Sequence, residues 1–252
     1  MPDDHRIQSE PSTSRRSPRL NDVPCQLVDA RREDARFLGW VIQTAFRSHL
    51  ERGMPDIFVD GSEEECVQFL EALSLTQARH WGNYENFIIA EAGGQQLGAL
   101  EGYFVEDCDG PAFGKGAVEV ARQLGWPNER LAAAWRRIIS NTYVSIDRVP
   151  GAWVVESVAV RPAFRRMGLV SQMLEAILDR GRQRGATYAE IGVFIGQRSC
   201  PAGVRESGLR GRRRRSEFRV RGGVQKSGRT AAAAIAVNQR DQPKPRARVL
   251  SR

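Results

Sequence analysis

The sequence has little of what metal sites, disulfide frameworks and membrane spans require. Its 252 residues include four cysteines, with no C-x-x-C spacing, and only three histidines. We therefore expect neither a zinc site nor a set of disulfides. No apolar run approaches the roughly 18 residues that cross a bilayer, and the first residues lack the apolar stretch of a secretory signal. We expect a cytoplasmic protein with no bound metal and no membrane partner.

Positive charge is concentrated at one end of the chain. The formal net charge is +8, but residues 197–252 carry 14 Arg and 2 Lys against three acidic residues, a net charge of +13. The remaining 196 residues carry −5, so the rest of the chain is mildly acidic. Clustered arginine attracts phosphate, but one aromatic residue, Phe218, provides no stacking platform for bases. Nucleic acid is therefore the least favoured partner, and binding through this tail stays an alternative function.

Composition divides the chain into three parts. Residues 1–24 are rich in Ser, Pro, Asp and Arg with few aliphatic side chains, so we predict a disordered leader. Residues 25–196 contain helical and strand-like apolar patterns, and we predict one domain there. Residues 197–252 are one-quarter Arg and show no sustained apolar periodicity, so we predict a disordered tail.

Apolar spacing in the central part predicts an α/β domain with a mixed sheet. Ser62 followed by Glu65 is a capping-box pattern that opens one of its helices. A strand, a helix and a strand between residues 153 and 195 form a βαβ unit, which requires at least one parallel pair. The other predicted elements are strands over residues 26–29, 87–91 and 97–104 and helices over residues 33–50, 117–124 and 129–140.

The connection inside the βαβ unit carries the residues on which a functional prediction depends. From Glu156 to Val170 it reads E-S-V-A-V-R-P-A-F-R-R-M-G-L-V. A helix N-terminus leaves N–H groups unpaired and carries partial positive charge, so it suits a phosphate. Gly168 lets the backbone approach a pyrophosphate, and Arg165 and Arg166 supply fixed positive charge.

This segment resembles the acetyl-CoA-binding signature of the GNAT acetyltransferases. Arg165, Gly168 and Val170 match the pattern Q/R-x-x-G-x-G/A, except that Val170 stands where Gly or Ala is usual and would crowd the helix start. The order of predicted strands and helices is similar too. The resemblance implies the GNAT fold, acetyl-CoA as co-substrate, and acetyl transfer to a primary amine of a small molecule or a peptide. It leaves a homodimer open.

The resemblance also implies which residues bind the co-substrate. The backbone of residues 158–160 would pair with the pantetheine arm and hold the oxyanion. The N–H groups of residues 165–171 would bind the pyrophosphate. The implied binding residues are Val158, Ala159, Val160, Arg165, Arg166, Met167, Gly168, Leu169, Val170 and Ser171.

Acetyl transfer to an amine also needs a base. An alkylammonium acceptor must lose a proton before it attacks the thioester, because its reference pKa is about 10. A carboxylate acting through water is the usual solution. We predict Glu156 as this base, because it precedes the cofactor loop with the side-chain parity of Val158 and Val160. Glu101 is the reserve candidate, and a catalytically dead CoA-binding protein stays an alternative.

The family pattern breaks after Gly196. A GNAT continues there with a helix and two strands, typically through N-x-x-A-x-x-x-Y-E-x-x-G-F, whose Tyr is expected to protonate the departing thiolate. Nothing of the kind follows here. A one-base shift of reading frame over residues 196–210 permits D-N-D-P-A-Q-R-A-Y-E-S-L-G-F at successive positions. We therefore hypothesise that the chain is out of frame from Gln197 onward.

This hypothesis has a structural consequence. We expect the fold to be truncated after the βαβ unit, so that the last strand of that unit has an uncovered edge and exposed apolar surface. The chain as written would then be poorly folded and have little acetyltransferase activity.

Overall fold

Seven strands form one mixed sheet in the computed structural model, which describes residues 25–108, 111–140, 148, 150–194, 218–223 and 230–237. The strand order is β1-β2-β3-β4-β5-β7-β6, and all neighbours are antiparallel except β4 and β5. The parallel pair is the one that the βαβ pattern predicts. The strands are β1 (Gln26–Asp29), β2 (Phe87–Ala92), β3 (Gln95–Phe104), β4 (Trp153–Val160), β5 (Tyr188–Phe194), β6 (Phe218–Gly223) and β7 (Thr230–Val237).

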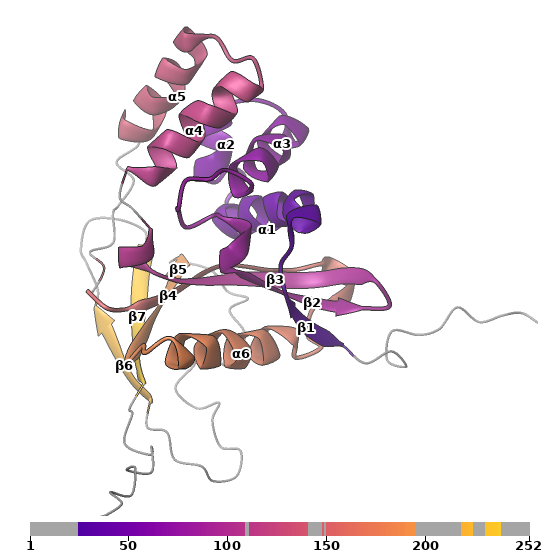
Figure 1. Ribbon diagram of the computed structural model, residues 1–252, viewed down its shortest axis with the longest axis vertical. Coiled ribbons are helices and arrows are strands. Elements are labelled where there is room, and N and C mark those ends of the chain that lie inside the picture. Colours follow the sequence, from indigo (N-terminus) through magenta and orange to yellow (C-terminus); the bar gives the residue numbers. More distant parts are fainter. Residues whose placement is uncertain are drawn as a thin grey trace, which may run out of the picture.

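Helices cover both faces of this sheet. In Figure 1, α6 runs along one face, while α1, α2 and α3 lie over the other. The capping box at Ser62 is confirmed, since its hydroxyl accepts from the amide of Glu65 and the Glu65 carboxylate accepts from the amide of Ser62. The helices are α1 (Ala35–Arg47), α2 (Met54–Val59), α3 (Glu63–Ser74), α4 (Ala112–Gln123), α5 (Asn128–Ser140) and α6 (Leu169–Gln183).

The sheet separates two apolar cores. On the α6 face, Trp153 is fully buried between α6 and β3. A Cβ added at Gly102 or Gly181 would lie within 2.8 Å of the indole, so both glycines are needed for this close approach. The α1 face holds a second core in which Ala99 and Ala159 of the sheet meet α1 and α3. Because neighbouring residues of a strand face opposite cores, each side chain of β3 and β4 can be assigned to one face.

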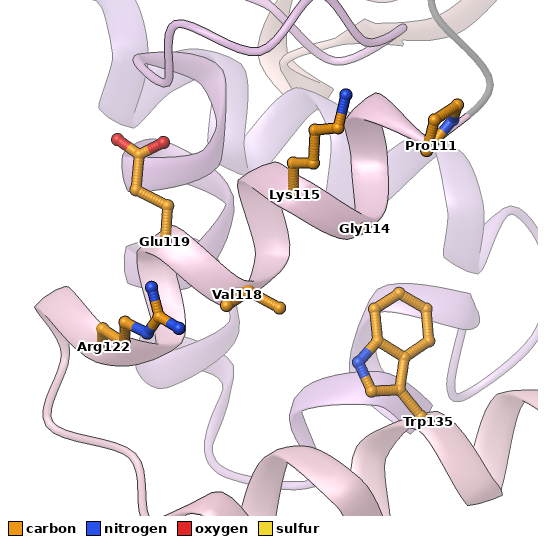
Figure 2. Close-up of a pocket in the computed structure, with 7 residues that line it drawn as sticks. All are labelled: Pro111, Gly114, Lys115, Val118, Glu119, Arg122 and Trp135. Carbon is orange, nitrogen blue, oxygen red and sulfur yellow. The ribbon is translucent and has the colours of Figure 1, made fainter.

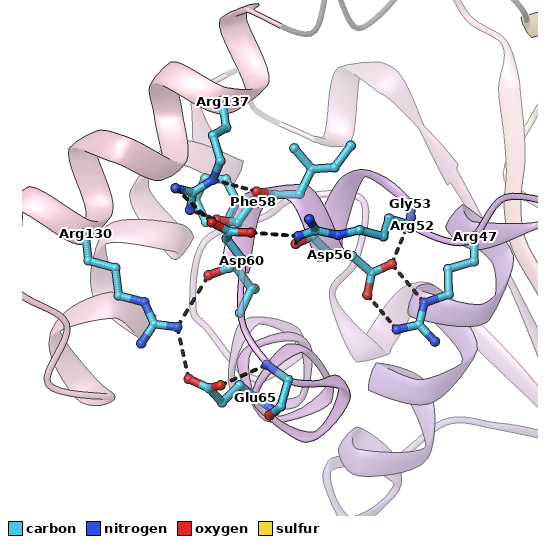
Figure 3. A network of polar contacts seen from close by, with 12 residues as sticks. Arg47, Arg52, Gly53, Asp56, Phe58, Asp60, Glu65, Arg130 and Arg137 are labelled. Atoms are coloured by element: carbon cyan, nitrogen blue, oxygen red, sulfur yellow. Dashed lines mark hydrogen bonds and ion pairs between the residues drawn. The ribbon is translucent and has the colours of Figure 1, made fainter.

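Arginines hold the short helix α2 in place, and Figure 3 shows their contacts. The last carbonyls of a helix have no partner within it. Here Arg137 of α5 donates to the carbonyls of Ile57 and Phe58 at 2.8 and 2.9 Å. Arg130 donates to the Glu65 carboxylate at 3.1 Å. α5 is thereby tied to α2 and α3, which in turn pack on α1.

The chain between β3 and β4 contains the helix pair α4 and α5. In Figure 1 this pair lies farther from the sheet than α1, and it packs on α2 and α3. The predicted helix over residues 117–124 begins earlier, at Ala112. The pair therefore extends the helical layer on the α1 face only.

The described part of the tail departs from the disordered tail that we predict. Strand β7 pairs antiparallel with the whole of β5, from Tyr188↔Ala236 to Phe194↔Thr230, and β6 pairs with β7. The expectation that the edge of β5 is uncovered is therefore wrong, because the backbone groups of β5 are paired with β7. Alanine is a poor strand former, so the composition of β7 gives no strand signal, and the open edge of β5 overrides that preference. The predicted leader, residues 1–24, and the rest of the tail lie outside the described residues.

Candidate functional site

Strand β4 contains an irregularity in the middle of the predicted site. Its register with β3 runs from Ala99↔Ala159 to Glu101↔Glu156, so two residues of β4 oppose one residue of β3. This is a β-bulge, a feature that re-aims side chains beside active sites. Ser157, at the bulge, has φ 47°, which is strained for a residue other than glycine.

The bulge corrects the predicted orientation of Glu156. Val155 and Val158 both pack into the core on the α6 face, although an odd number of steps separates them. Glu156 instead lies opposite Glu101, on the face that carries α1. The expected parity with Val158 and Val160 is therefore wrong, because the extra residue reverses the alternation. Glu156 still lies directly before the predicted cofactor segment.

Strands β4 and β5 part at the same point. Their parallel pairing covers only Trp153–Val155 against Ala189–Ile191. On the side facing β5, no described strand pairs with residues 156–160. Because unpaired backbone groups of an edge recruit an extended partner, this edge can pair with a linear ligand. Val158, Ala159 and Val160 lie along this edge.

The loop after β4 presents unpaired amides at the start of α6. The first helical hydrogen bond runs from the amide of Gln172 to the carbonyl of Gly168. Within the described part of the chain, no group accepts from the amides of residues 166–171. Gly168 has φ 80° at the N-cap and Arg166 has φ 65°, so the chain turns sharply here. Such amides, with the positive end of the helix dipole, are suited to bind an anion.

The side chains of this loop divide into exposed cations and apolar anchors. Arg165, Arg166 and Met167 are exposed, as are Gly168 and Ser171. Leu169 is buried, and Val170 packs against the α6-side core. The side chain of Val170 therefore points into the protein and away from the exposed start of α6, where we expected it to crowd the co-substrate.

A cluster of charged side chains lies on the α1 face where β4 and β5 part. We define the glutamate cluster as Glu101, Tyr103, Arg148, Glu156 and Glu190. The Glu156 carboxylate accepts from Arg148 at Oε1 and from the Tyr103 hydroxyl at Oε2, the latter at 3.0 Å. Arg148 Nη1 is also 3.7 Å from Glu190 Oε2. Two carboxylates thus share one arginine.

Glu101 differs from the other acids of the cluster. It is 0% exposed, and neither of its carboxyl oxygens has a hydrogen-bond partner among the described residues. Burial raises the pKa of Glu101 well above its ordinary value of 4.5, and the Glu156 carboxylate raises it further; Ser157 and Arg148 lower it only in part. Burial thus favours the protonated, neutral form of Glu101.

The two non-acidic members of the cluster keep their protons. Burial raises the pKa of Tyr103 well above 10.0, and the Glu156 carboxylate raises it further. Burial alone would lower the pKa of Arg148, but Glu156 and Tyr103 raise it overall. Both residues thus remain hydrogen-bond donors to Glu156.

Sequence patterns reveal Glu156 and Glu101 but miss the rest of the cluster. The sequence contains a signal for Tyr103, because this residue stands two positions after Glu101 and so lies on the same face of the strand. Arg148 and Glu190 have none, because they reach the cluster from a loop and from another strand. Among the described residues, Cys25, Cys66 and Cys108 are free thiols.

An open hollow elsewhere on the molecule contains none of the predicted site residues. Figure 2 shows it between α4 and α5. The residues that line it are Pro111, Gly114, Lys115, Val118, Glu119, Arg122 and Trp135. No helix among the described residues is long and apolar enough to cross a membrane.

Comparison with known proteins gives the family. The sequence matches the model of the Acetyltransferase (GNAT) family over residues 55–200. A solved acetyltransferase structure is 18% identical, with a TM-score of 0.61, and the match covers 84% of this chain and 100% of the other. An N-acetyltransferase from Staphylococcus aureus Mu50 is 13% identical, with a TM-score of 0.53 and coverage of 84% and 100%. No curated protein matches the sequence. Because the family model covers more than half of the chain, the protein belongs to the GNAT acetyltransferase family, whose co-substrate is acetyl-CoA.

Proposed function

We propose that this protein transfers the acetyl group of acetyl-CoA directly to a primary amine, with Glu156 as the general base. The observation that carries the proposal is the continuous surface from the free edge of β4 to the unpaired amides at the start of α6. It offers backbone groups for the pantetheine arm at residues 158–160 and an anion site for the pyrophosphate at residues 165–171. We also propose a cytoplasmic location.

The β4 bulge supports the assignment of the reaction centre. It turns Glu156 to the α1 face while the backbone of residues 158–160 stays free on the side of β5. An amine arriving from the α1 side would then meet the thioester where β4 and β5 part. N–H groups at residues 158–160 would stabilise the oxyanion as the nitrogen attacks the carbonyl carbon. The C–S bond then breaks, and the thiolate of CoA leaves.

The exposure of Glu156 supports its assignment as the base. It is the partly exposed carboxylate of the cluster, with a side chain 20% exposed, whereas Glu101 is fully enclosed. A water molecule or the amine itself can therefore reach Glu156 but not Glu101. Glu101, the reserve candidate, is better placed to act on Glu156 as a neutral neighbour than to meet a substrate.

An assay of CoA release tests this function. The chain is incubated with acetyl-CoA and a panel of primary amines, and free thiol is measured over time. The proposal requires amine-dependent thiol release together with an acetylated product. Binding of acetyl-CoA without transfer to any amine would identify a catalytically dead CoA-binding protein. That alternative has one observation in its favour, since both oxygens of Glu156 are already engaged.

A further inference from the structure

The arginine of the glutamate cluster comes from outside the sheet that carries the acids. Arg148 lies between α5 and β4, while Glu156 and Glu190 lie on β4 and β5. Its guanidinium reaches both acids, donating to Glu156 and lying 3.7 Å from Glu190. The side chains of Arg148, Glu156 and Glu190 are 20%, 20% and 4% exposed. The structure thus shows a partly enclosed position for a cation between two carboxylates.

Other buried groups at this position lack partners of their own. Both carboxyl oxygens of Glu101 and the hydroxyl of Ser157 lack a hydrogen bond of good geometry within the described residues, although they are 0% and 7% exposed and Ser157 lies close enough to lower the pKa of Glu101. Buried polar groups without partners are rare in folded proteins and need an explanation. The carboxyl of Glu101 stands opposite Glu156 in the register, on the same face of the sheet. An ammonium group has three donors and no acceptor, so in the place of the guanidinium it can donate to Glu156 without adding an unpaired acceptor beside Glu101.

The same position has the geometry that an acceptor needs. Glu156 directly precedes the bulge after which the backbone edge of β4 becomes free. While Arg148 is in place, it donates to Oε1 of Glu156 and Tyr103 donates to Oε2, so an acceptor must compete with these donors for the base. An acceptor that displaces the guanidinium frees Oε1 at the point where its own nitrogen must be deprotonated.

We propose that the Arg148 guanidinium occupies the site of the acceptor's ammonium group, and that this site takes amines with no carboxylate close to the nitrogen. The inference rests on the proposed function, since it assigns the acceptor to the Glu156 site. The exclusion of carboxylates follows from charge, because a carboxylate would face Glu156 and Glu190 with only Arg148 to attract it. The substrate class is an alkyl amine or polyamine rather than an amino acid.

Three matched ligands test the predicted class. Cadaverine is lysine without its carboxylate, and pentylamine is cadaverine without its second amine. Binding of each to the CoA-saturated protein is measured by calorimetry. We expect cadaverine to bind at least about tenfold more tightly than lysine, because like-charge contacts reject the wrong ligand. Pentylamine should follow cadaverine rather than lysine. Equal or tighter binding of lysine would overturn the proposal, since Arg148 would then serve a substrate carboxylate.

Arg148→Gln tests the occupancy itself. If the guanidinium competes with the acceptor, its removal should tighten cadaverine binding and lower the KM for cadaverine by about tenfold, with the KM for acetyl-CoA unchanged. Arg148→Lys keeps the competing charge and should stay close to the parent. Weaker cadaverine binding in Arg148→Gln would show that the arginine supports the site, and would overturn the proposal.

A matched control separates the effect from general loss of an ion pair. Arg180 has a side chain 21% exposed and pairs with Asp29, away from the cluster. Arg180→Gln should leave cadaverine affinity unchanged, and melting curves of each variant report whether it folds. The proposed function can fail on its own. It fails if acetyl-CoA does not bind or if no amine is acetylated, even when cadaverine binds Arg148→Gln more tightly than the parent.

Discussion

Two buried groups of acids and arginines in this protein differ in how completely they are paired. Around α2, Asp56 is 6% exposed, and both of its oxygens are filled. Oδ1 accepts from Gln43 at 2.9 Å and from Arg47 at 2.8 Å, and Oδ2 accepts from Arg47 and the Gly53 amide at 2.9 and 2.8 Å. Figure 3 shows the contacts of Asp56 with Arg47 and Gly53. In the glutamate cluster, Glu101 is buried just as deeply and has none.

The pKa shifts follow this difference. Burial would raise the pKa of Asp56, but hydrogen bonds from Arg47, Gly53 and Gln43 lower it overall, so the carboxylate stays charged. For Glu101, burial acts without such compensation and raises the pKa. A fully paired acid fixes structure, because every group it contacts is held in one geometry. An acid left without partners costs stability, and sites that bind or react are where proteins accept that cost.

Asp56→Ala should give the largest effect on stability. It leaves Arg47 without its main partner and empties a packed polar site, so we expect a loss of about 3–5 kcal/mol in the free energy of unfolding. Urea unfolding measures it. Asp179→Ala is the control, because Asp179 pairs with Arg182 on the surface of α6 and should cost at most about 1 kcal/mol. Equal losses in the two variants would remove the distinction that we draw between the two groups.

Glu156→Gln should have the opposite profile, with a large effect on rate and little on stability. We expect turnover at neutral pH to fall by about 100-fold. The deficit should shrink as pH approaches about 10, because the free amine is then abundant and needs no base. The measurement is a pH profile of acetyl transfer by both proteins. A variant profile parallel to that of the parent would remove Glu156 as the base.

Glu101→Gln should give the smallest effect, a gain in stability that depends on pH. The folded protein holds the proton of Glu101 above the ordinary pKa of 4.5, while the unfolded chain releases it there. Parent stability therefore falls as pH rises from 4.5 toward the folded pKa, and the amide avoids this loss. We expect the variant's Tm to exceed the parent's at pH 8, by a difference that grows as pH rises from 4.5 toward the folded pKa. At pH 4 the two proteins should have the same Tm. A difference in Tm that is the same at all pH values would contradict the raised pKa of Glu101.

The part of the site predicted from sequence is the part that one short segment encodes. Strand β4, the turn and the start of α6 are contiguous, so local patterns predict both the elements and the positions of Gly168 and Arg165. The parity argument misses the bulge at Ser157, because Val158 and Val160 alternate with Ala159 as in a regular strand and only the adjacent pair Glu156-Ser157 interrupts the pattern. The sequence therefore predicts the wrong face of the sheet for the side chain of Glu156. Arg148 and Glu190 join the cluster only through tertiary contacts.

The fold shows the same limit. Helix α2 has six residues, too few for apolar periodicity, and its one local signal is Pro55 at the first turn. Strands β6 and β7 form where composition predicts disorder, because pairing with β5 outweighs the preference of alanine. The hypothesis of a shifted reading frame from Gln197 stays a prediction. Resequencing tests it, and an intact single frame encoding residues 212–215 as printed would refute it.

Binding of acetyl-CoA at the start of α6 is the central claim, and a pair of glycine variants tests it most directly. Gly168 and Gly185 lie near opposite ends of α6 with φ of 80° and 93°, and an added Cβ meets nothing within 4 Å at either position. An aspartate therefore adds similar backbone strain at both, but only at position 168 would its charge face the pyrophosphate. Calorimetric titration with acetyl-CoA should show binding to the parent and to Gly185→Asp, and none to Gly168→Asp. Equal affinity of all three proteins would contradict the assignment of the loop.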